Sequence, residues 1–188
     1  LILSDEVYEH IVFDDSRHES LSRYPELAER SLVISSFGKT YHLTGWKIGY
    51  CAAPMAITEE FRRVHQFVTY AVNTPVQHAY AEYMADPATY NTLHRFYQKK
   101  RDIFLDALSE SRFKMVPAGG TYFQMLDYSE ISDLADHEFA MKLIKDVGVA
   151  AIPPSAFYID GDQNQSLRFC FAKKDDTLRE AAERLCAV

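Results

Sequence analysis

The sequence lacks three features that would point to particular classes of protein. It has no apolar run near the roughly 18 residues that span a bilayer, which argues against an integral membrane protein. It has no excess of positive charge, since 20 Lys and Arg against 27 Asp and Glu give a net charge of −7. We therefore expect neither nucleic acid nor membrane as a partner. Its cysteines (Cys51, Cys170 and Cys186) form no C-x-x-C pair, which predicts buried free thiols in a reducing cytoplasm.

The chain also lacks an initiator methionine. It opens on Leu1-Ile2-Leu3, an apolar run typical of a buried strand. A natural terminus seldom begins inside a core strand, because such a strand needs neighbours on both sides. We therefore expect these 188 residues to be the C-terminal half of a longer protein, and to be inactive on their own.

What is present suits a globular fold of the α/β class. The hydrophobic share of 47% is ordinary for such proteins, and 13% aromatic residues can fill a sizeable core. Short apolar runs and helical periodicity predict an α/β part followed by a smaller α+β part, with a hinge at Asp86-Pro87. The expected strands are 1–4, 32–35, 49–53, 113–116, 121–126, 149–152 and 167–171; the expected helices are 25–28, 57–70, 76–84, one burying Leu93 to Leu108, 136–147 and one from 175.

A lysine directly follows the second expected strand. Lys39 stands in Ser36-Phe37-Gly38-Lys39-Thr40, at the carboxyl end of that strand, where α/β sheets place ligands. A lysine held in such a place can act as a Schiff-base nucleophile. A solvated loop lysine is the commoner case, so the neighbouring residues must decide between the two interpretations.

Four other residues favour the functional interpretation. Ser36 and Lys47 supply the short hydroxyl donor and the cation that a phosphate dianion needs. Asp5 and Tyr8 follow the first expected strand; a carboxylate there can keep a pyridine nitrogen protonated, and a phenol can hydrogen-bond the oxygen at ring position 3. Asp-x-x-Tyr alone is a weak signal, but followed by Ser-x-x-Lys and then a cation it becomes specific.

A cation also lies inside an apolar strand near the C-terminus. Arg168 stands between Leu167 and Phe169, and a guanidinium buried there needs an anionic partner. Its planar fork matches a carboxylate in two-point contact. That carboxylate belongs either to a substrate or to an Asp or Glu of the same domain, and the strand pattern leaves both open.

Together these motifs resemble the class I, fold-type I aminotransferases that depend on pyridoxal 5'-phosphate (PLP), and within them the kynurenine and methionine aminotransferase branch. The resemblance runs the whole length of the chain. It is carried by Ser4-Asp5-Glu6-Val7-Tyr8, Ser36-Phe37-Gly38-Lys39-Thr40, Thr44-Gly45-Trp46-Lys47-Ile48-Gly49, Gly119-Gly120-Thr121-Tyr122-Phe123 and Leu167-Arg168-Phe169-Cys170-Phe171.

The resemblance implies a fold, a cofactor and a set of roles. It implies that residues 1–86 are the C-terminal part of the large PLP-binding domain and that residues 87–188 are the small C-terminal domain. Lys39 would hold the cofactor as a Schiff base and shuttle the proton. The other implied roles are Asp5 at the pyridine nitrogen, Tyr8 at the 3-oxygen, Ser36 and Lys47 at the phosphate, and Arg168 at the substrate α-carboxylate, with no metal.

The resemblance further implies a homodimer with shared active sites and a reaction in the cytoplasm. The amino group would pass from an apolar, aromatic or neutral amino acid, of the methionine, phenylalanine, tyrosine and glutamine class, to a 2-oxo acid. One alternative is a PLP-dependent β-lyase acting on cysteine conjugates or cystathionine with the same residues. Another is an aminotransferase-like domain of a transcriptional regulator, which the upstream sequence would reveal.

Overall fold

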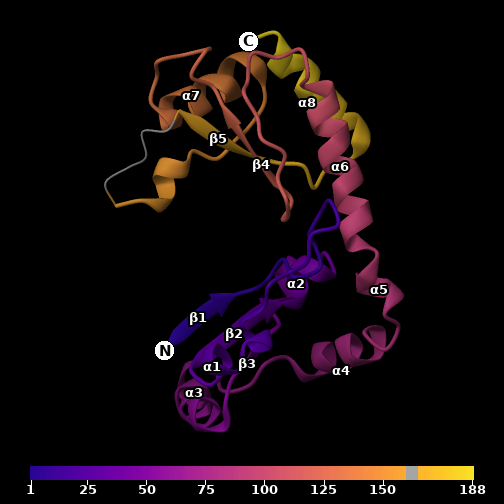
Figure 1. The fold of residues 1–188 in the computed structure, drawn as a ribbon, viewed down its shortest axis with the longest axis vertical. Helices are drawn as coiled ribbons and strands as arrows, with labels where there is room; N and C mark the ends of the chain where they lie inside the picture. The colour runs from indigo at the N-terminus through magenta and orange to yellow at the C-terminus, as the bar shows by residue number, and fades with distance from the viewer. Residues whose placement is uncertain (160–164) are drawn as a thin grey trace. The chain divides into compact units, whose positions relative to one another are not determined.

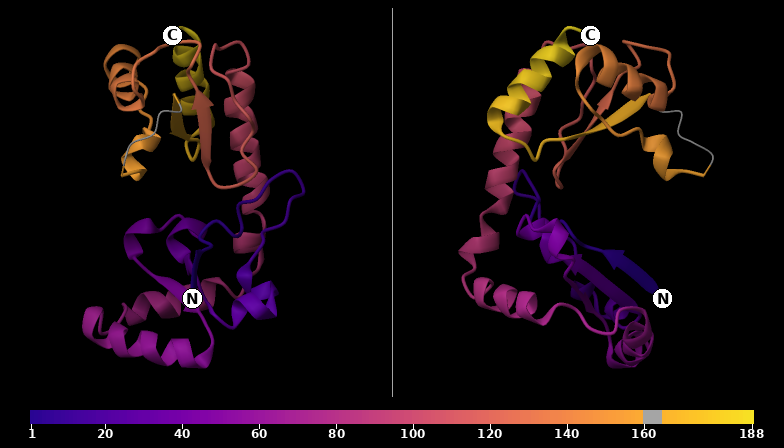
Figure 2. Two further views of the ribbon diagram at one scale, coloured as in Figure 1. Left: turned by 60° about the vertical axis from the view of Figure 1, so that its left-hand side comes forward. Right: turned by 180° about the vertical axis from the view of Figure 1, so that it is seen from behind.

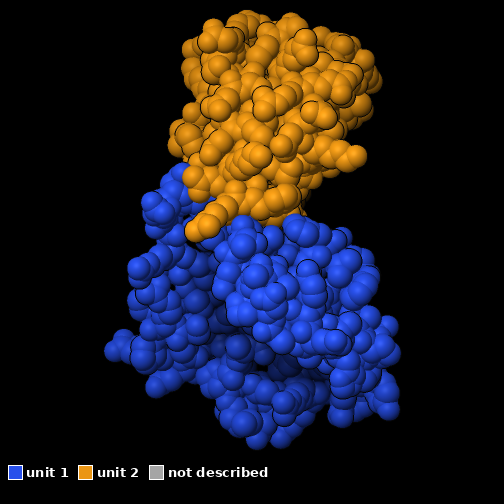
Figure 3. All heavy atoms as spheres, turned by 90° about the vertical axis from the view of Figure 1, so that its right-hand side faces the viewer, with its two compact units in different colours: residues 1–94 blue, residues 95–188 orange. Residues whose placement is uncertain are grey.

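The chain forms two compact units, residues 1–94 and residues 95–188 (Figure 3). The computed structural model describes residues 1–159 and 165–188. The mixture of helices and strands confirms the expected α/β class. The assignment of residues 1–86 and 87–188 to a large and a small domain stays a prediction.

The first unit is built on a three-stranded sheet in the order β1-β2-β3 (Figure 1). Strands β1 (Ile2–Asp5) and β2 (Ser31–Ser36) are parallel, and β3 (Gly49–Ala52) is antiparallel to β2. All three occur where the apolar runs predict strands. The burial expected for β1 refers to a longer protein and stays a prediction; among the described residues, Leu1 and Leu3 are 89% and 69% exposed. β1 is an edge strand of the described sheet, and the side chains of Leu3 and Asp5 are exposed.

Helices of the first unit follow the expected positions closely. The expected short helix at 25–28 is α1, and Asn73 Oδ1 caps the start of α4 by accepting from the Val76 N–H (3.2 Å). Tyr41, Ile48 and Tyr80 form a small aromatic core against which Phe37 packs. The helical segments are η1 (Leu21–Arg23), α1 (Pro25–Ala28), α2 (Phe37–Thr40), η2 (Thr44–Trp46), α3 (Met55–Val68), α4 (Thr74–Tyr83) and α5 (Ala88–Asn91).

The second unit packs helices against a two-stranded antiparallel sheet of β4 (Phe123–Asp127) and β5 (Ser166–Cys170). Helices α6 (Leu93–Ala107) and α8 (Asp175–Cys186) run side by side (Figure 2). Lys100 Nζ lies 2.9 Å from the Asp175 carboxylate, and Cys186 Sγ lies 3.5 Å from the Ala107 carbonyl, so the two helices point the same way. The remaining helical segments are α7 (Asp136–Lys142), η3 (Leu143–Val147) and η4 (Pro154–Phe157).

Two expected strands of this unit are wrong in extent. Residues 113–116 and 149–152 each contribute one isolated bridge, Lys114 with Asp127 and Ile152 with Arg168. Helical periodicity predicts that Phe96 and Ile144 are buried, but they are 49% and 44% exposed. Both lie beside the apolar stripe of their helix, which is narrower than the sequence pattern suggests. Among the described residues, no helix has the length and apolar character needed to cross a bilayer.

Gly49 allows strand β3 to approach strand β2 closely. A Cβ atom on Gly49 would lie 2.3 Å from the Ser35 carbonyl oxygen of the neighbouring strand, whereas nothing lies within 4 Å of a Cβ on Gly45. We predict that Gly49→Ala lowers the free energy of unfolding of the full-length protein by about 1–3 kcal/mol, because β3 must move away from β2. Gly45→Ala is the control and should change it by less than about 0.5 kcal/mol. Urea unfolding of both variants checks this, and equal midpoints would show that the close approach has no energetic weight.

Candidate functional site

Two of the predicted site residues share one face of the first sheet. β1 and β2 are parallel, with Asp5 beside Ile34, so Ser36 lies two residues further along β2 and on the same face as Asp5. Strand spacing and rise put their Cα atoms roughly 8 Å apart. The Asp5 carboxylate is exposed and accepts only the Val7 N–H (3.2 Å) among the described residues. The structure therefore brings a carboxylate and a hydroxyl to the same sheet edge.

Lys39 follows on the short helix α2, which starts at this edge (Figure 1). Ser36 Oγ caps α2 by accepting the Gly38 N–H (3.3 Å), and its hydroxyl hydrogen remains available to a second acceptor. A Cβ on Gly38 would lie 2.9 Å from the Thr44 Cα, so glycine allows α2 and the following turn to pack closely. Lys39 itself is half-buried. Lys39 therefore follows Ser36 by one turn of α2.

Lys47 ends the turn η2 in a left-handed conformation, with φ of 55°. It is exposed, and in the described part of the chain its ammonium group has no carboxylate partner. The residue stands two positions before Gly49, whose strand pairs with Ser36 across the sheet. Lys47 thus lies on the turn that leads into the strand beside Ser36.

Tyr8 lies in a double turn directly after β1. The Glu9 N–H bonds to the Glu6 carbonyl (3.1 Å), and the Ile11 N–H bonds to the Tyr8 carbonyl (2.9 Å). The Ile11 side chain is buried and anchors the end of this turn. Tyr8 therefore sits on a hydrogen-bonded loop held at the same strand end as Asp5.

Two acidic residues of this loop were missed by the sequence analysis. The Glu6 carboxylate accepts bonds from Ser4 Oγ (3.0 Å), His18 Nε2 (2.9 Å) and the Leu21 N–H (3.0 Å). Burial opposes its ionisation, but these donors together hold the pKa of Glu6 below its ordinary value. Glu9 accepts bonds from strands β2 and β3, as described below. Apart from Ser4, the donors to these two carboxylates are 12 or more residues away, so no local pattern could have revealed the contacts.

Arg168 occupies the second unit, on β5. Its guanidinium carbon lies 4.2 Å from the ring centroid of Phe123 and 4.8 Å from that of Phe157, so two aromatic rings flank the cation. Its Nε is buried and has no hydrogen-bond partner among the described residues. Since an unpaired buried donor is costly, this atom favours an external acceptor over the internal carboxylate that the sequence left open.

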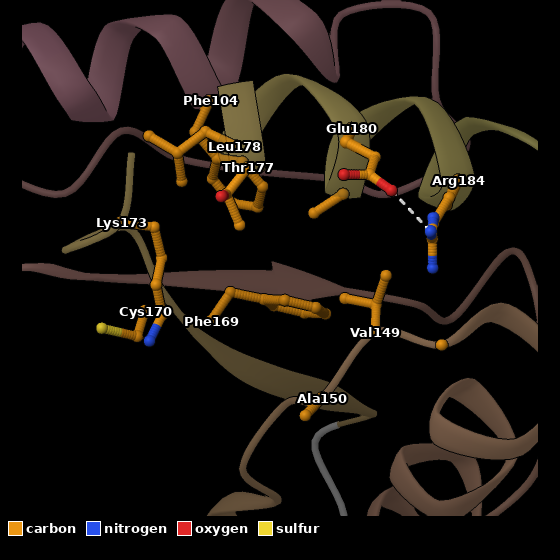
Figure 4. Close-up of a pocket in the computed structure, with 12 residues that line it drawn as sticks. Phe104, Val149, Ala150, Phe169, Cys170, Lys173, Thr177, Leu178, Glu180 and Arg184 are labelled. Carbon is orange, nitrogen blue, oxygen red and sulfur yellow. Dashed lines mark hydrogen bonds and ion pairs between the residues drawn. The ribbon is translucent and has the colours of Figure 1, made fainter. Parts of the chain in front are cut away.

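A pocket of about 260 Å³ lies elsewhere in the second unit, between α8 and β5 (Figure 4). Apolar side chains such as Phe104, Val149 and Leu178 line it, and the Arg184–Glu180 ion pair stands at its rim. None of the six predicted site residues lines this pocket. It therefore belongs to the packing of the second unit and not to the predicted site.

Comparison with curated proteins gives long matches to aminotransferases. The chain is 52% identical over 185 residues to the methionine aminotransferase of Escherichia coli, covering 98% of this chain and 48% of that protein. It is 37% identical over 206 residues to the kynurenine–oxoglutarate transaminase of Dictyostelium discoideum, covering 98% of this chain and 47% of the relative. The chain thus spans about half the length of the relatives it matches.

Solved structures agree with these sequence matches. The crystal structure of the E. coli methionine aminotransferase superposes with a TM-score of 0.95, covering 99% of this chain and 50% of that one. The N-succinyldiaminopimelate aminotransferase of Mycobacterium tuberculosis superposes with a TM-score of 0.92 at 38% identity, covering 98% of this chain and 49% of that one. The family pattern of aminotransferase class I and II matches residues 1–185. The chain belongs to the class I and II aminotransferase family.

Proposed function

We propose that the full-length protein is a PLP-dependent aminotransferase that moves the amino group of an apolar, aromatic or neutral amino acid to a 2-oxo acid. The observation that carries the proposal is the placement of Asp5 and Ser36 on one face of the sheet, with Lys39 in the next turn. The 52% identity to a methionine aminotransferase supports the substrate class. The upstream half of the protein would supply the rest of the site.

The donors and acceptors present fit PLP. Bound PLP would supply an electron sink for negative charge at the substrate α-carbon. Asp5 offers an exposed carboxylate that would keep the pyridine nitrogen protonated, and Tyr8 would donate to the 3-oxygen. The Ser36 hydroxyl and the Lys47 ammonium would hold the phosphate, since both have bonding capacity to spare among the described residues.

Lys39 and Arg168 would act on the substrate. The Lys39 amine would hold the cofactor covalently in the resting enzyme and take up the proton from the substrate α-carbon. The Arg168 guanidinium, fixed between Phe123 and Phe157 with its Nε unpaired, would bind the α-carboxylate in two-point contact. An amino acid held at its carboxylate presents its α-carbon in a fixed orientation, which is the main requirement for selective proton removal.

The assembly that we propose is a homodimer that works in the cytoplasm. The end of α3 and the residues after it expose large apolar side chains: Phe67, Val68 and Tyr70 are 85%, 78% and 85% exposed. Apolar surface of this kind is typical of an interface. The resemblance to the family implies that Asn73-Thr74 would reach toward the phosphate site of a second subunit, which supports this assembly.

The first test concerns Lys39. Borohydride reduction of the full-length holoenzyme should fix the cofactor to the peptide that contains Lys39, and Lys39→Ala should abolish turnover while leaving the other cofactor-binding groups in place. Peptide mass spectrometry identifies the labelled lysine. Label on any other lysine would overturn the assignment.

The second test concerns Asp5. Asp5→Ala should lower kcat on the order of 10²-fold or more, because the ring nitrogen loses the charge that keeps it protonated. The matched control is Asp86→Ala. Asp86 makes the same local bond, from its carboxylate to the N–H two residues on (Ala88, 2.9 Å), but lies far along the chain from the site. If both variants keep normal turnover, Asp5 only shapes its turn.

The third test concerns the substrate. In aspartate-type relatives a cation just before the stretch that matches Asn73-Thr74 binds the second carboxylate of the substrate, but residues 67–72 contain no Arg or Lys. We expect a higher kcat/KM for methionine, phenylalanine, tyrosine or glutamine than for aspartate. A new amino acid as product supports a transaminase, whereas pyruvate and a thiol from a cysteine conjugate would indicate the β-lyase. A preference for aspartate would contradict the proposed substrate class.

A further inference from the structure

Glu9 joins the loop after β1 to both neighbouring strands. Its carboxylate accepts a bond from Ser35 Oγ on β2 (3.0 Å) and bonds from the Tyr50 hydroxyl on β3 (2.9 Å to each oxygen). Ser35 and Tyr50 face each other across the antiparallel pair, so Glu9 spans the register partners of two strands. The Phe37 ring packs 5.5 Å from the Tyr50 ring and continues this contact toward α2. The Glu9 side chain thus joins the loop that carries Tyr8 to strand β2, which ends at Ser36, and to strand β3.

The donors to Glu9 are well suited to a lasting contact. Ser35 is almost fully buried, at 2% exposed. Burial, and next the hydrogen bond to Glu9, raise the pKa of Tyr50 to about 12, so its phenol remains a donor throughout the physiological range. Hydrogen bonds to a carboxylate are stronger than those between neutral groups. The hydrogen bonds from Ser35 and Tyr50 to Glu9 therefore hold the loop after β1 in one defined position on the sheet.

Two of the segments that Glu9 joins carry a residue of the proposed site directly next to the contact. Tyr8 directly precedes Glu9, and Ser36 directly follows Ser35. Because neighbouring side chains of a strand point to opposite faces, a bond that holds Ser35 on one face fixes Ser36 on the other. Glu9 itself reaches no proposed ligand group, so its effect must pass through these neighbours.

Resting on the proposed function, we propose that Glu9 is a positioning residue that fixes Tyr8 relative to Ser36 and Lys39 by anchoring the loop after β1 to β2 and β3. The Tyr8 hydroxyl then meets the 3-oxygen of the bound cofactor in one orientation. Loss of the anchor lets the loop and Tyr8 move while Tyr8 itself remains present. The consequence is a weaker hydrogen bond to that oxygen and a change in the proton affinity of the bound cofactor.

The test is a pH titration of the visible absorption of the cofactor bound to the full-length enzyme. A donor to the 3-oxygen favours its anionic form, so Tyr8→Phe should raise the spectroscopic pKa by about one pH unit. Glu9→Ala should raise it in the same direction, and Glu9→Ala combined with Tyr8→Phe should raise it no further than Tyr8→Phe alone. Glu9→Gln keeps one acceptor oxygen and should give a smaller shift than Glu9→Ala.

Glu19→Gln is the matched control. Glu19 also accepts a bond from a tyrosine hydroxyl (Tyr24, 2.7 Å), but both side chains are exposed, and the printed partners of Glu19 lie outside β1, β2 and β3. It should leave the spectroscopic pKa unchanged. Tyr50→Phe removes one donor to Glu9 and leaves Glu9 in place, so it should reproduce part of the shift in the spectroscopic pKa. It serves as the test if Glu9→Ala fails to fold.

Three results would overturn the inference, and they are distinguishable. If Tyr8→Phe shifts the spectroscopic pKa but Glu9→Gln and Tyr50→Phe do not, Glu9 serves only the stability of the loop while the proposed function stands. Glu9 is likewise limited to loop stability if the shifts of Glu9→Ala and Tyr8→Phe simply add. If Tyr8→Phe itself has no effect, the role proposed for Tyr8 is wrong, and the role of Glu9 falls with it.

Discussion

The parallel pairing of β1 and β2 is the constraint on which the site depends. Parallel strands end at the same edge of a sheet, and their period of two puts Asp5 and Ser36 on one face of it. A register shift of one residue would turn the Asp5 carboxylate to the opposite face. The N-terminal cap at Ser36 then starts α2, which carries Lys39 forward from the same edge. Backbone pairing thus brings Asp5 to the strand end from which Ser36 and Lys39 follow, although Asp5 is far from both in the sequence.

The rest of the first unit keeps this edge in register. Gly49 permits the close approach of β3 to β2, and Gly38 permits the turn after α2 to pack against it. Glu6 anchors the segment between β1 and β2 by accepting hydrogen bonds from the His18 side chain and the Leu21 N–H. Glu9 closes the same loop against the sheet. Glycines allow close packing where two backbones approach each other. Carboxylates form the hydrogen bonds between segments that are far apart in the sequence.

Much of this arrangement could be predicted from local patterns. The apolar runs predicted β1, β2 and β3, and the left-handed Gly148 ends its helix as expected, with φ of 73°. Contacts between distant residues could not be predicted, because Glu9 meets Ser35 and Tyr50 across 26 and 41 positions. Burial was also misjudged where the apolar residues are adjacent to a helical stripe, as at Phe96. Local sequence specifies elements well, whereas side-chain partners depend on the register that the elements adopt.

The central claim is that the edge formed by β1 and β2 holds PLP in the full-length protein. A crystal structure of that protein with bound cofactor tests it most directly. We expect an Asp5 carboxylate oxygen about 3 Å from the pyridine nitrogen, with the Lys39 amine covalently attached to the cofactor. A cofactor bound elsewhere, or an Asp5 carboxylate more than roughly 6 Å from the ring nitrogen and turned to solvent, would contradict it.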